Sequence, residues 1–139
     1  MRAGPVPRSD AAVIVSLTEF KANRLRDLPG IVREGISLSR GWWALPGAVG
    51  VSLYLDLTRR TGGSISVWRS EADLRRFVSL PRHLAIVRRY RSRVTVRSAT
   101  WETQDFRAAR VHAQRRALLS GEATPGGAAV RVNQRGHRL

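Results

Sequence analysis

Two side chains in this sequence, His83 and Arg97, are of types that can act in catalysis, and their positions in the expected elements suit such a role. His83 follows Pro81 near the start of an expected helix, where an imidazole can move protons near neutral pH or bind iron, or can simply pack its own helix. Arg97 lies in the middle of an expected strand, and a buried guanidinium requires an anionic partner. That partner is either Asp56, in a structural ion pair, or an anionic substrate or enolate that Arg97 would stabilise.

Aromatic and small polar side chains alternate along the expected strands in such a way that we place them on the same face of the sheet as Arg97. The predicted substrate-binding set consists of Phe20, Tyr54, Asp56, Ser66 and Trp101, with Trp68 placed beside His83 and Arg97 as a catalytic residue. Small side chains leave space and aromatic ones line it, as in a ligand pocket. Trp68 would stack on a flat substrate, and the Tyr54 hydroxyl would orient a substrate oxygen. The alternative interpretation of the same composition is a moderately polar subunit interface.

Residues of the other parity are almost wholly aliphatic. They are Val13, Val15 and Leu17, the alternate residues from Val49 to Leu57, Ile65, Val67, Val94 and Val96. Side chains of a strand alternate between the two faces of its sheet. The aliphatic set is therefore predicted to form the floor on which the helices pack.

The spacing of apolar residues and the turn residues between them predict the strands and helices that position these side chains. Strands are predicted at residues 11–21, 49–58, 64–68 and 94–101, and helices at residues 28–43, from residue 70 onward and within residues 107–119. Ser70 opens the second helix with a sequence that resembles a capping box, and Pro81 breaks that helix. The order β-α-β-β-α-β predicts a ferredoxin-like α+β fold with a four-stranded antiparallel sheet and both helices on one face. The other face would be bare, and a second copy is its usual cover, so we expect a homodimer.

The chain of 139 residues predicts one domain. We expect a flexible leader at residues 1–10, the ferredoxin-like domain at 11–106, a possible helix at 107–119 and a disordered basic tail at 120–139.

Composition excludes several classes of function. The absence of cysteine rules out thiolate catalysis and cysteine-bound metals, and His, Asp and Glu show no metal-site spacing, so no metal is predicted. No apolar run is long enough to span a membrane or act as a signal peptide, so a cytoplasmic protein is expected. The net charge of +15 suggests nucleic acid, but all basic residues except Lys21 are arginine and they are spread along the chain. Nucleic acid is therefore an unlikely partner.

Residues 66–89, SVWRSEADLRRFVSLPRHLAIVRR, resemble the dimeric α/β-barrel superfamily, which includes antibiotic-biosynthesis and haem-degrading monooxygenases. The shared pattern is a strand ending in Trp68, an acidic helix start at Ser70 and Glu71, an aromatic residue at Phe77, and a histidine at His83 after a proline break. Residues 45–56 look like the superfamily's entry to its second strand. Within the superfamily the chain is most similar to the spheroidene-monooxygenase-like and uncharacterised bacterial branch.

The resemblance implies a homodimeric, monooxygenase-like enzyme that oxidises a hydrophobic, secondary-metabolite-type substrate, in several members without any cofactor. In haem-degrading members a histidine of the second helix binds haem, and His83 and Trp68 match the haem-site histidine and tryptophan. The asparagine of those members has no counterpart in the first strand, which offers Ser16 and Thr18. We therefore predict a cofactor-free enzyme, with haem as a possibility. A non-catalytic dimer that binds a ligand or haem is the alternative, and a basic nucleic-acid binder is the third.

Overall fold

The computed structural model describes residues 1–7, 11–121 and 131–135. Its main elements are β1 (Arg2–Ala3), β2 (Val13–Ala22), α1 (Leu28–Arg40), β3 (Ala48–Asp56), β4 (Thr61–Trp68), α2 (Glu71–Val78), α3 (Pro81–Tyr90), β5 (Val94–Thr103), α4 (Ala108–Ser120) and β6 (Arg131–Arg135). The predicted α+β class and the β-α-β-β-α-β order of the central elements are confirmed.

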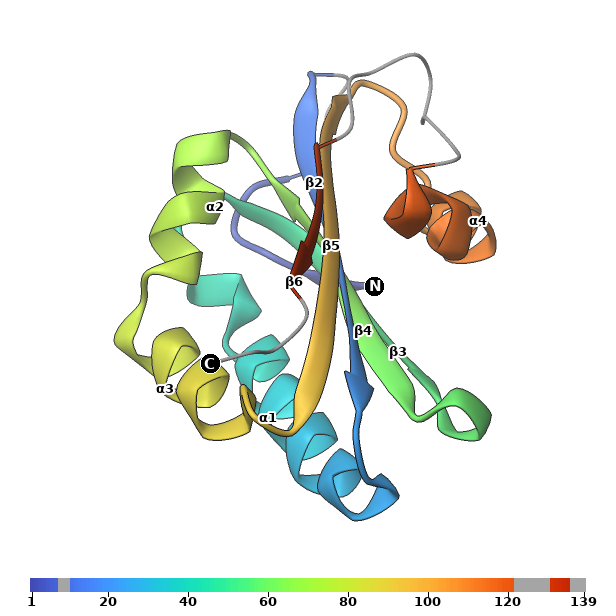
Figure 1. The fold of residues 1–139 in the computed structure, drawn as a ribbon. Coiled ribbons are helices and arrows are strands. Elements are labelled where there is room, and N and C mark those ends of the chain that lie inside the picture. The colour runs from blue at the N-terminus through green and yellow to red at the C-terminus, as the bar shows by residue number, and fades with distance from the viewer. Residues whose placement is uncertain (8–10, 122–130, 136–139) are drawn as a thin grey trace.

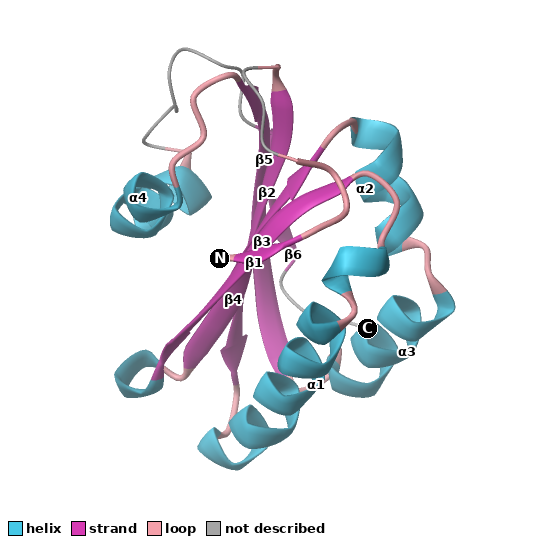
Figure 2. Cartoon of the chain, turned by 180° about the vertical axis from the view of Figure 1, so that it is seen from behind, coloured by secondary structure: helices cyan, strands magenta, loops and turns pink. Residues whose placement is uncertain are grey.

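One antiparallel sheet organises the molecule, with the strand order β1-β3-β4-β2-β5-β6. The four predicted strands form its centre in the ferredoxin-like order, and β1 and β6 extend its two edges. Helices α1, α2 and α3 lie on one face of the sheet, and α4 lies on the other (Figures 1 and 2). The sheet of the single chain is open and does not close into a barrel.

Local signals in the sequence fix the helix boundaries. The Ser70 hydroxyl accepts a hydrogen bond from the backbone N–H of Asp73 at 3.2 Å, which satisfies one of the free donors at the start of α2. Pro81 stands in the first turn of α3, where its missing N–H has no cost. Helix α1 ends at Arg40, three residues before the predicted end at residue 43, because Gly41 is followed by a short 3-10 turn over Trp42–Ala44.

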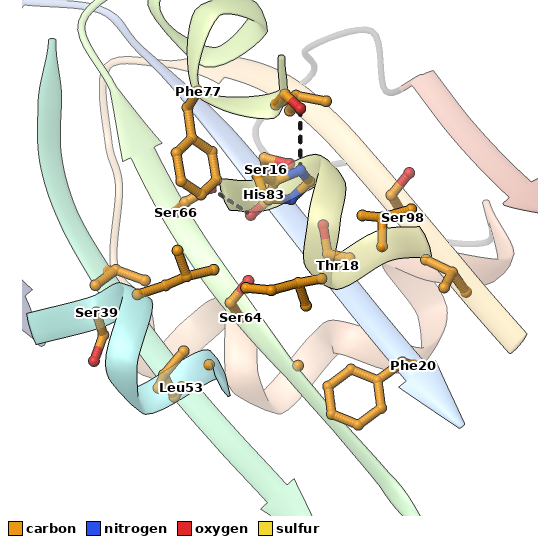
Figure 3. Close-up of a pocket in the computed structure, with 18 of the residues that line it drawn as sticks. Ser16, Thr18, Phe20, Ser39, Leu53, Ser64, Ser66, Phe77, His83 and Ser98 are labelled. Carbon is orange, nitrogen blue, oxygen red and sulfur yellow. Dashed lines mark hydrogen bonds between the residues drawn. The ribbon is translucent and has the colours of Figure 1, made fainter. Parts of the chain in front are cut away.

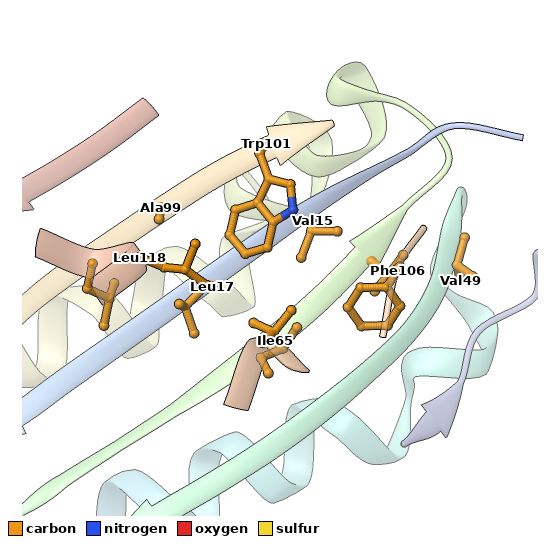
Figure 4. Close-up of a cluster of buried hydrophobic side chains, with 11 residues drawn as sticks. Val15, Leu17, Val49, Ile65, Ala99, Trp101, Phe106 and Leu118 are labelled. Carbon is orange, nitrogen blue, oxygen red and sulfur yellow. The ribbon is translucent and has the colours of Figure 1, made fainter. Parts of the chain in front are cut away.

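The prediction that the aliphatic strand residues face the two main helices is wrong for β2 and β4. Val15, Leu17, Ile65 and Val67 pack instead in a cluster with α4 on the opposite face (Figure 4). Helix α4 contributes Leu118, which is fully buried, and the same cluster holds Phe106, Val111 and Leu119. Burial of apolar area drives this choice, because α4 offers the aliphatic face an apolar cover within the same chain.

The prediction also grouped the aliphatic residues of all four strands on one face of the sheet. Those of β3 and β5, such as Val51 and Val96, lie instead on the face opposite to those of β2 and β4. A bulge between Ala48 and Gly50 inserts a residue into β3, so Val49 faces the α4 side while Val51 faces α1 and α2. In β5, the pairing of Trp101 with Val15 places the indole on the α4 face. The predicted binding set thus combined residues from two faces of the sheet.

Both ends of the chain differ from the predicted flexible segments. Arg2 of β1 pairs with Val51 of β3, so the expected leader is in part a strand. In the expected tail, Ser120 ends α4, and β6 pairs along β5 from Val96 to Thr100. The rest of these two predictions, at residues 8–10, 122–130 and 136–139, lies outside the described residues. Among the residues that are described, no helix is long and apolar enough to cross a membrane.

The sheet face that was expected to be bare is covered by α4. The reasoning that a second copy must cover this face is therefore wrong, because the helix already buries the apolar area there. Homodimerisation itself stays a prediction.

Replacement of Leu118 tests how much α4 contributes to the fold. Leu118→Ala should lower the free energy of unfolding by about 2–5 kcal/mol in urea denaturation, because it opens a cavity between α4 and the sheet. Leu57, which is 62% exposed, provides the control, and Leu57→Ala should change stability by less than about 0.5 kcal/mol. Equal effects of the two replacements would show that α4 does not pack on the sheet as described.

Candidate functional site

A large open cleft of about 1620 Å³ lies between the sheet and the layer of α1, α2 and α3. Its floor is made by side chains of β2, β4 and β5, and its walls by apolar residues of the helices and β3 (Figure 3). The polar residues of the floor are all alcohols, namely Ser16, Thr18, Ser64, Ser66, Ser98 and Thr100. A mostly apolar cleft with a few convergent polar groups is the usual form of a site for a small hydrophobic ligand.

Strand pairing orders these hydroxyl groups into two rows. Ser16 of β2 lies opposite Ser66 of β4 on one side and Thr100 of β5 on the other. Thr18 lies in the same way between Ser64 and Ser98. Neighbouring strands are about 4.8 Å apart, so each row presents three hydroxyl groups at a regular spacing. The sequence reasoning placed Ser16, Thr18, Ser64 and Ser66 together but missed Ser98 and Thr100, because it assigned β5 the wrong parity.

Three aromatic side chains close one end of the cleft. The rings of Trp42 and Trp68 have centroids 5.1 Å apart, and Phe77 lies 5.0 Å from Trp42 and 5.2 Å from Trp68. Trp68 is fully buried, and its indole N–H donates to the hydroxyl of Ser66 at 3.0 Å. Trp68 therefore supports the wall and fixes Ser66, whereas the predicted stacking on a substrate would require an exposed ring face.

Trp42 carries the one buried side-chain polar atom that lacks a hydrogen-bond partner among the described residues, its indole Nε1. The residue is 3% exposed and forms part of the lining of the cleft. Buried indole N–H groups usually find a partner, so this donor stands out. No signal in the sequence marks the unpaired donor of Trp42.

His83 lies on the helix side of the cleft, as Figure 3 shows. Its Nδ1 is 3.1 Å from the carbonyl oxygen of Val78, and its ring centroid is 4.9 Å from that of Phe77. A carbonyl only accepts hydrogen bonds, so Nδ1 carries the proton and Nε2 has the free lone pair. Burial lowers the pKa of His83, with the Val78 hydrogen bond acting in the opposite direction. The neutral imidazole is thus held ready to accept a proton.

The opposite end of the cleft is apolar. Phe20 lies there beside a cluster of Ile31, Tyr90 and Val94. Phe20 lines the cleft, and its role in substrate binding stays a prediction. The cleft therefore has a polar floor, an aromatic end near His83 and an aliphatic and aromatic end near Phe20.

Tyr54 is among the residues that line the cleft, but its ring lies with the side chains of the α4 face of the sheet. Its hydroxyl donates to Glu19 at 3.0 Å, and the Arg115 guanidinium lies 4.5 Å above its ring. Burial, followed by the charge of Glu19, raises the pKa of Tyr54 well above its ordinary value. His112 of α4 packs against the same ring, and its Nε2 lies 3.0 Å from the Ser52 hydroxyl oxygen. These residues fasten α4 to the sheet.

Asp56, Arg97 and Trp101 lie outside the cleft. Asp56 accepts hydrogen bonds from the Thr58 hydroxyl at 2.6 Å and the Arg59 backbone at 3.3 Å, and the Thr58 bond is the main cause of its lowered pKa. Asp56 thus shapes the turn after β3 and does not pair with Arg97. Arg97 pairs with Glu19 in the strand register, which places its exposed side chain on the α4 face, and Trp101 is buried under α4.

The described residues contain no group of three His, Cys, Asp or Glu side chains able to hold a metal ion. The side chains of the cleft that could take part in chemistry are one imidazole, a set of neutral hydroxyl groups and a few charged groups. Glu71, Arg75 and Arg91 are the charged residues that line it, and Arg75 is paired with Glu71 at 3.7 Å.

Binding of an uncharged hydrophobic dye distinguishes the two sheet faces. Phe20→Ala should weaken binding of Nile red about fivefold, because it removes apolar contact area at one end of the cleft. Arg97→Gln should leave the affinity unchanged, since Arg97 lies on the α4 face. Fluorescence titration of both variants measures this, and an equal loss in Arg97→Gln would show that the dye site is not this cleft.

Comparison with known proteins gives matches at the level of structure. No family model and no curated protein matches the sequence. SnoaB, a cofactor-independent oxygenase from Streptomyces nogalater, superposes with a TM-score of 0.51 at 18% identity over 70% of this chain and 97% of that chain. A proposed antibiotic-biosynthesis monooxygenase from Deinococcus radiodurans gives a TM-score of 0.60 at 11% identity over 68% of this chain and 95% of that chain. The resemblance seen in the sequence is confirmed at the level of fold: the chain has the ferredoxin-like fold of the antibiotic-biosynthesis-monooxygenase-like proteins.

Proposed function

We propose that this protein is a cofactor-independent, monooxygenase-like enzyme that oxidises an uncharged, hydrophobic substrate in the cleft between the sheet and α1–α3. The observation that carries the proposal is the state of His83. It is a neutral imidazole that is anchored at Nδ1 by the Val78 carbonyl and has a free Nε2 on the wall of a large, mostly apolar cleft. A base in such a setting can remove a proton from a weakly acidic C–H group.

The fold comparison supports the same chemistry. SnoaB, which shares this fold, is a cofactor-independent oxygenase. The aromatic end of the cleft and the apolar end near Phe20 would hold the carbon skeleton of the substrate, and the hydroxyl floor would receive its oxygen atoms.

The proposed reaction converts a CH₂ group beside a carbonyl or an aromatic ring into a ketone. His83 Nε2 takes one proton, and the electron pair of the broken C–H bond stays on the substrate as a carbanion or enolate. The carbanion reduces O₂ and forms a C–O bond, and the resulting peroxide anion takes the proton back from His83. Loss of water from the hydroperoxide removes the second hydrogen and leaves C=O. One O₂ is consumed, one oxygen atom enters the substrate and the other leaves as water, so the substrate supplies all the electrons.

Replacement of His83 tests this role. His83→Ala should reduce substrate-dependent oxygen consumption by about 10²–10⁴-fold, the range for loss of a general base. His112→Ala is the matched control, because His112 belongs to α4 and lies outside the cleft, and it should retain most of the activity. An oxygen electrode with an anthrone-type carbon acid as substrate gives the rates. Activity that survives in His83→Ala would rule out His83 as the base.

The dependence of kcat/KM on pH should also reflect the protonation of His83. The neutral form of His83 is the active one, and burial lowers its pKa below the ordinary 6.5. The rate should therefore be constant around neutral pH and fall only as the pH drops through a value below 6.5. A profile of kcat/KM against pH that falls above pH 6.5 instead would contradict a buried, neutral base.

A haem-binding protein is the second candidate, favoured by the same anchored imidazole. Iron-binding histidines usually donate their other ring N–H to a carbonyl or carboxylate, as His83 does to Val78. Arg91 lines the cleft and would be available for a propionate, whereas Arg75 is paired with Glu71. Bound haem would supply redox chemistry at an iron held by His83. The floor offers Ser16 and Thr18 in place of an asparagine, which favours binding without haem degradation.

A haem titration separates the two candidates. If haem binds, a shift of its visible absorption band should saturate at one haem per chain and be lost in His83→Ala, because His83 would be the axial ligand. His112→Ala should bind as the parent protein does. A shift that persists in His83→Ala, or a shift without saturation, would remove the haem-binding function.

A homodimer and a cytoplasmic location remain part of the proposal. Helix α4 already occupies one sheet face, so a dimer would have to form through another surface or through exchange of α4 between copies.

A further inference from the structure

We infer that Ser16, Ser66 and Thr100 form an oxyanion site that binds the oxygen atom next to the reacting carbon. The inference rests on the proposed proton transfer to His83 and names residues that would stabilise its product. Removal of a proton beside a carbonyl moves negative charge onto the carbonyl oxygen, so the cleft needs hydrogen-bond donors at that position. Arg97, the residue predicted for this role, lies on the other face of the sheet.

The strand register gives these three hydroxyl groups one shared direction. Ser16 is paired with Ser66 on β4 and with Thr100 on β5, and all three line the floor of the cleft. Ser16 is 8% exposed and Ser66 is 6% exposed, so water competes little for them. Hydrogen bonds to an anion are stronger in such a setting than in water.

Ser66 is prepared to donate to a ligand. Its oxygen accepts the Trp68 indole N–H at 3.0 Å, which fixes the side chain. Its own proton points to the backbone carbonyl of Ser16 at 3.4 Å, longer than the usual range for a hydroxyl donor. A negatively charged oxygen in the cleft would offer this proton a better acceptor. Among the described residues, the hydroxyl groups of Ser16 and Thr100 have no side-chain partner that would compete with a ligand.

Contacts through Phe77 place this row, rather than the second one, near His83. Phe77 lies 4.9 Å from the His83 ring and 5.2 Å from Trp68, and Trp68 holds Ser66. In Figure 3, Phe77, Ser66 and Ser16 lie toward one end of the cleft and Phe20 lies toward the other. The second row, Thr18 with Ser64 and Ser98, lies one step toward Phe20. A substrate held against the first row would therefore present its acidic C–H group to His83 Nε2.

The unpaired Nε1 of Trp42 is an independent sign that this end of the cleft receives an oxygen atom. Trp42 packs on Trp68 and Phe77, the same two residues that connect Ser66 to His83. Its buried donor has no partner among the described residues. An oxygen acceptor brought by a ligand would satisfy it, and such a gain would favour oxygenated ligands over hydrocarbons.

A phenolic probe tests the site without any turnover. 7-Hydroxycoumarin absorbs differently as phenol and as phenolate, so titration at several pH values gives the affinity of the protein for each form. The parent protein should bind the phenolate more tightly than the phenol. Ser16→Ala and Thr100→Val should each weaken binding of the phenolate by about tenfold and of the phenol by less than about threefold, because a lost hydrogen bond costs more when the acceptor is charged.

Ser64→Ala and Ser98→Ala are the matched controls. They remove hydroxyl groups from the second row of the same floor, and they should leave the preference for phenolate unchanged. Ser16→Ala and Thr100→Val avoid the buried Ser66, whose loss would leave the Trp68 indole unpaired and reduce stability. Ser66→Ala is therefore examined only alongside a thermal melting curve.

Three outcomes would overturn the inference: equal losses from both rows, no preference for phenolate in the parent protein, or no binding of the probe at millimolar concentration. Its failure is distinguishable from failure of the proposed function. A phenolate preference that depends on Ser16 and Thr100, without oxygen consumption on any carbon acid, would support the oxyanion site and reject the oxygenase. Oxygen consumption that depends on His83 but not on Ser16 would support the oxygenase and reject this site.

Discussion

Packing of α4 against the sheet is the interaction on which the site depends. The helix buries the aliphatic side chains of β2 and β4, among them Leu17 and Ile65, within one chain. Because that face is occupied by the main apolar core, the face with Ser16 and Ser66 is turned toward α1, α2 and α3. Small alcohols cannot fill the space under those helices, so a cleft remains between sheet and helices.

The aromatic cluster at one end of the cleft fixes the positions of polar side chains by packing. Trp42 and Phe77 pack edge to face, and both rings make tilted contacts with Trp68, which holds the three rings in fixed positions. Through these contacts the packing positions His83 on one side of the cleft and Ser66 on the other. A base and a set of neutral donors then face the same volume, which is the arrangement needed to form an enolate in an apolar cleft.

The polar residues on the α4 face have a different role. Tyr54, Glu19 and Arg115 form a connected group that joins β2 and β3 to α4. Burial and the charge of Glu19 keep the Tyr54 hydroxyl protonated by raising its pKa, so it serves as a hydrogen-bond donor in the fold. Tyr54 looks like a substrate-binding residue in the sequence, but its contacts are those of a structural clamp.

The sequence by itself determined the order of the elements, the cap at Ser70, the break at Pro81 and the position of His83 near a helix start, because each of these depends on residues close together in the chain. It also predicted the shared face of Phe20 and Ser66, since β2 and β4 are regular. Only the tertiary structure decided which face carries Tyr54, Arg97 and Trp101. That choice depends on the bulge in β3, on the register of β5 against β2 and on the packing of α4, which are contacts between residues far apart in sequence.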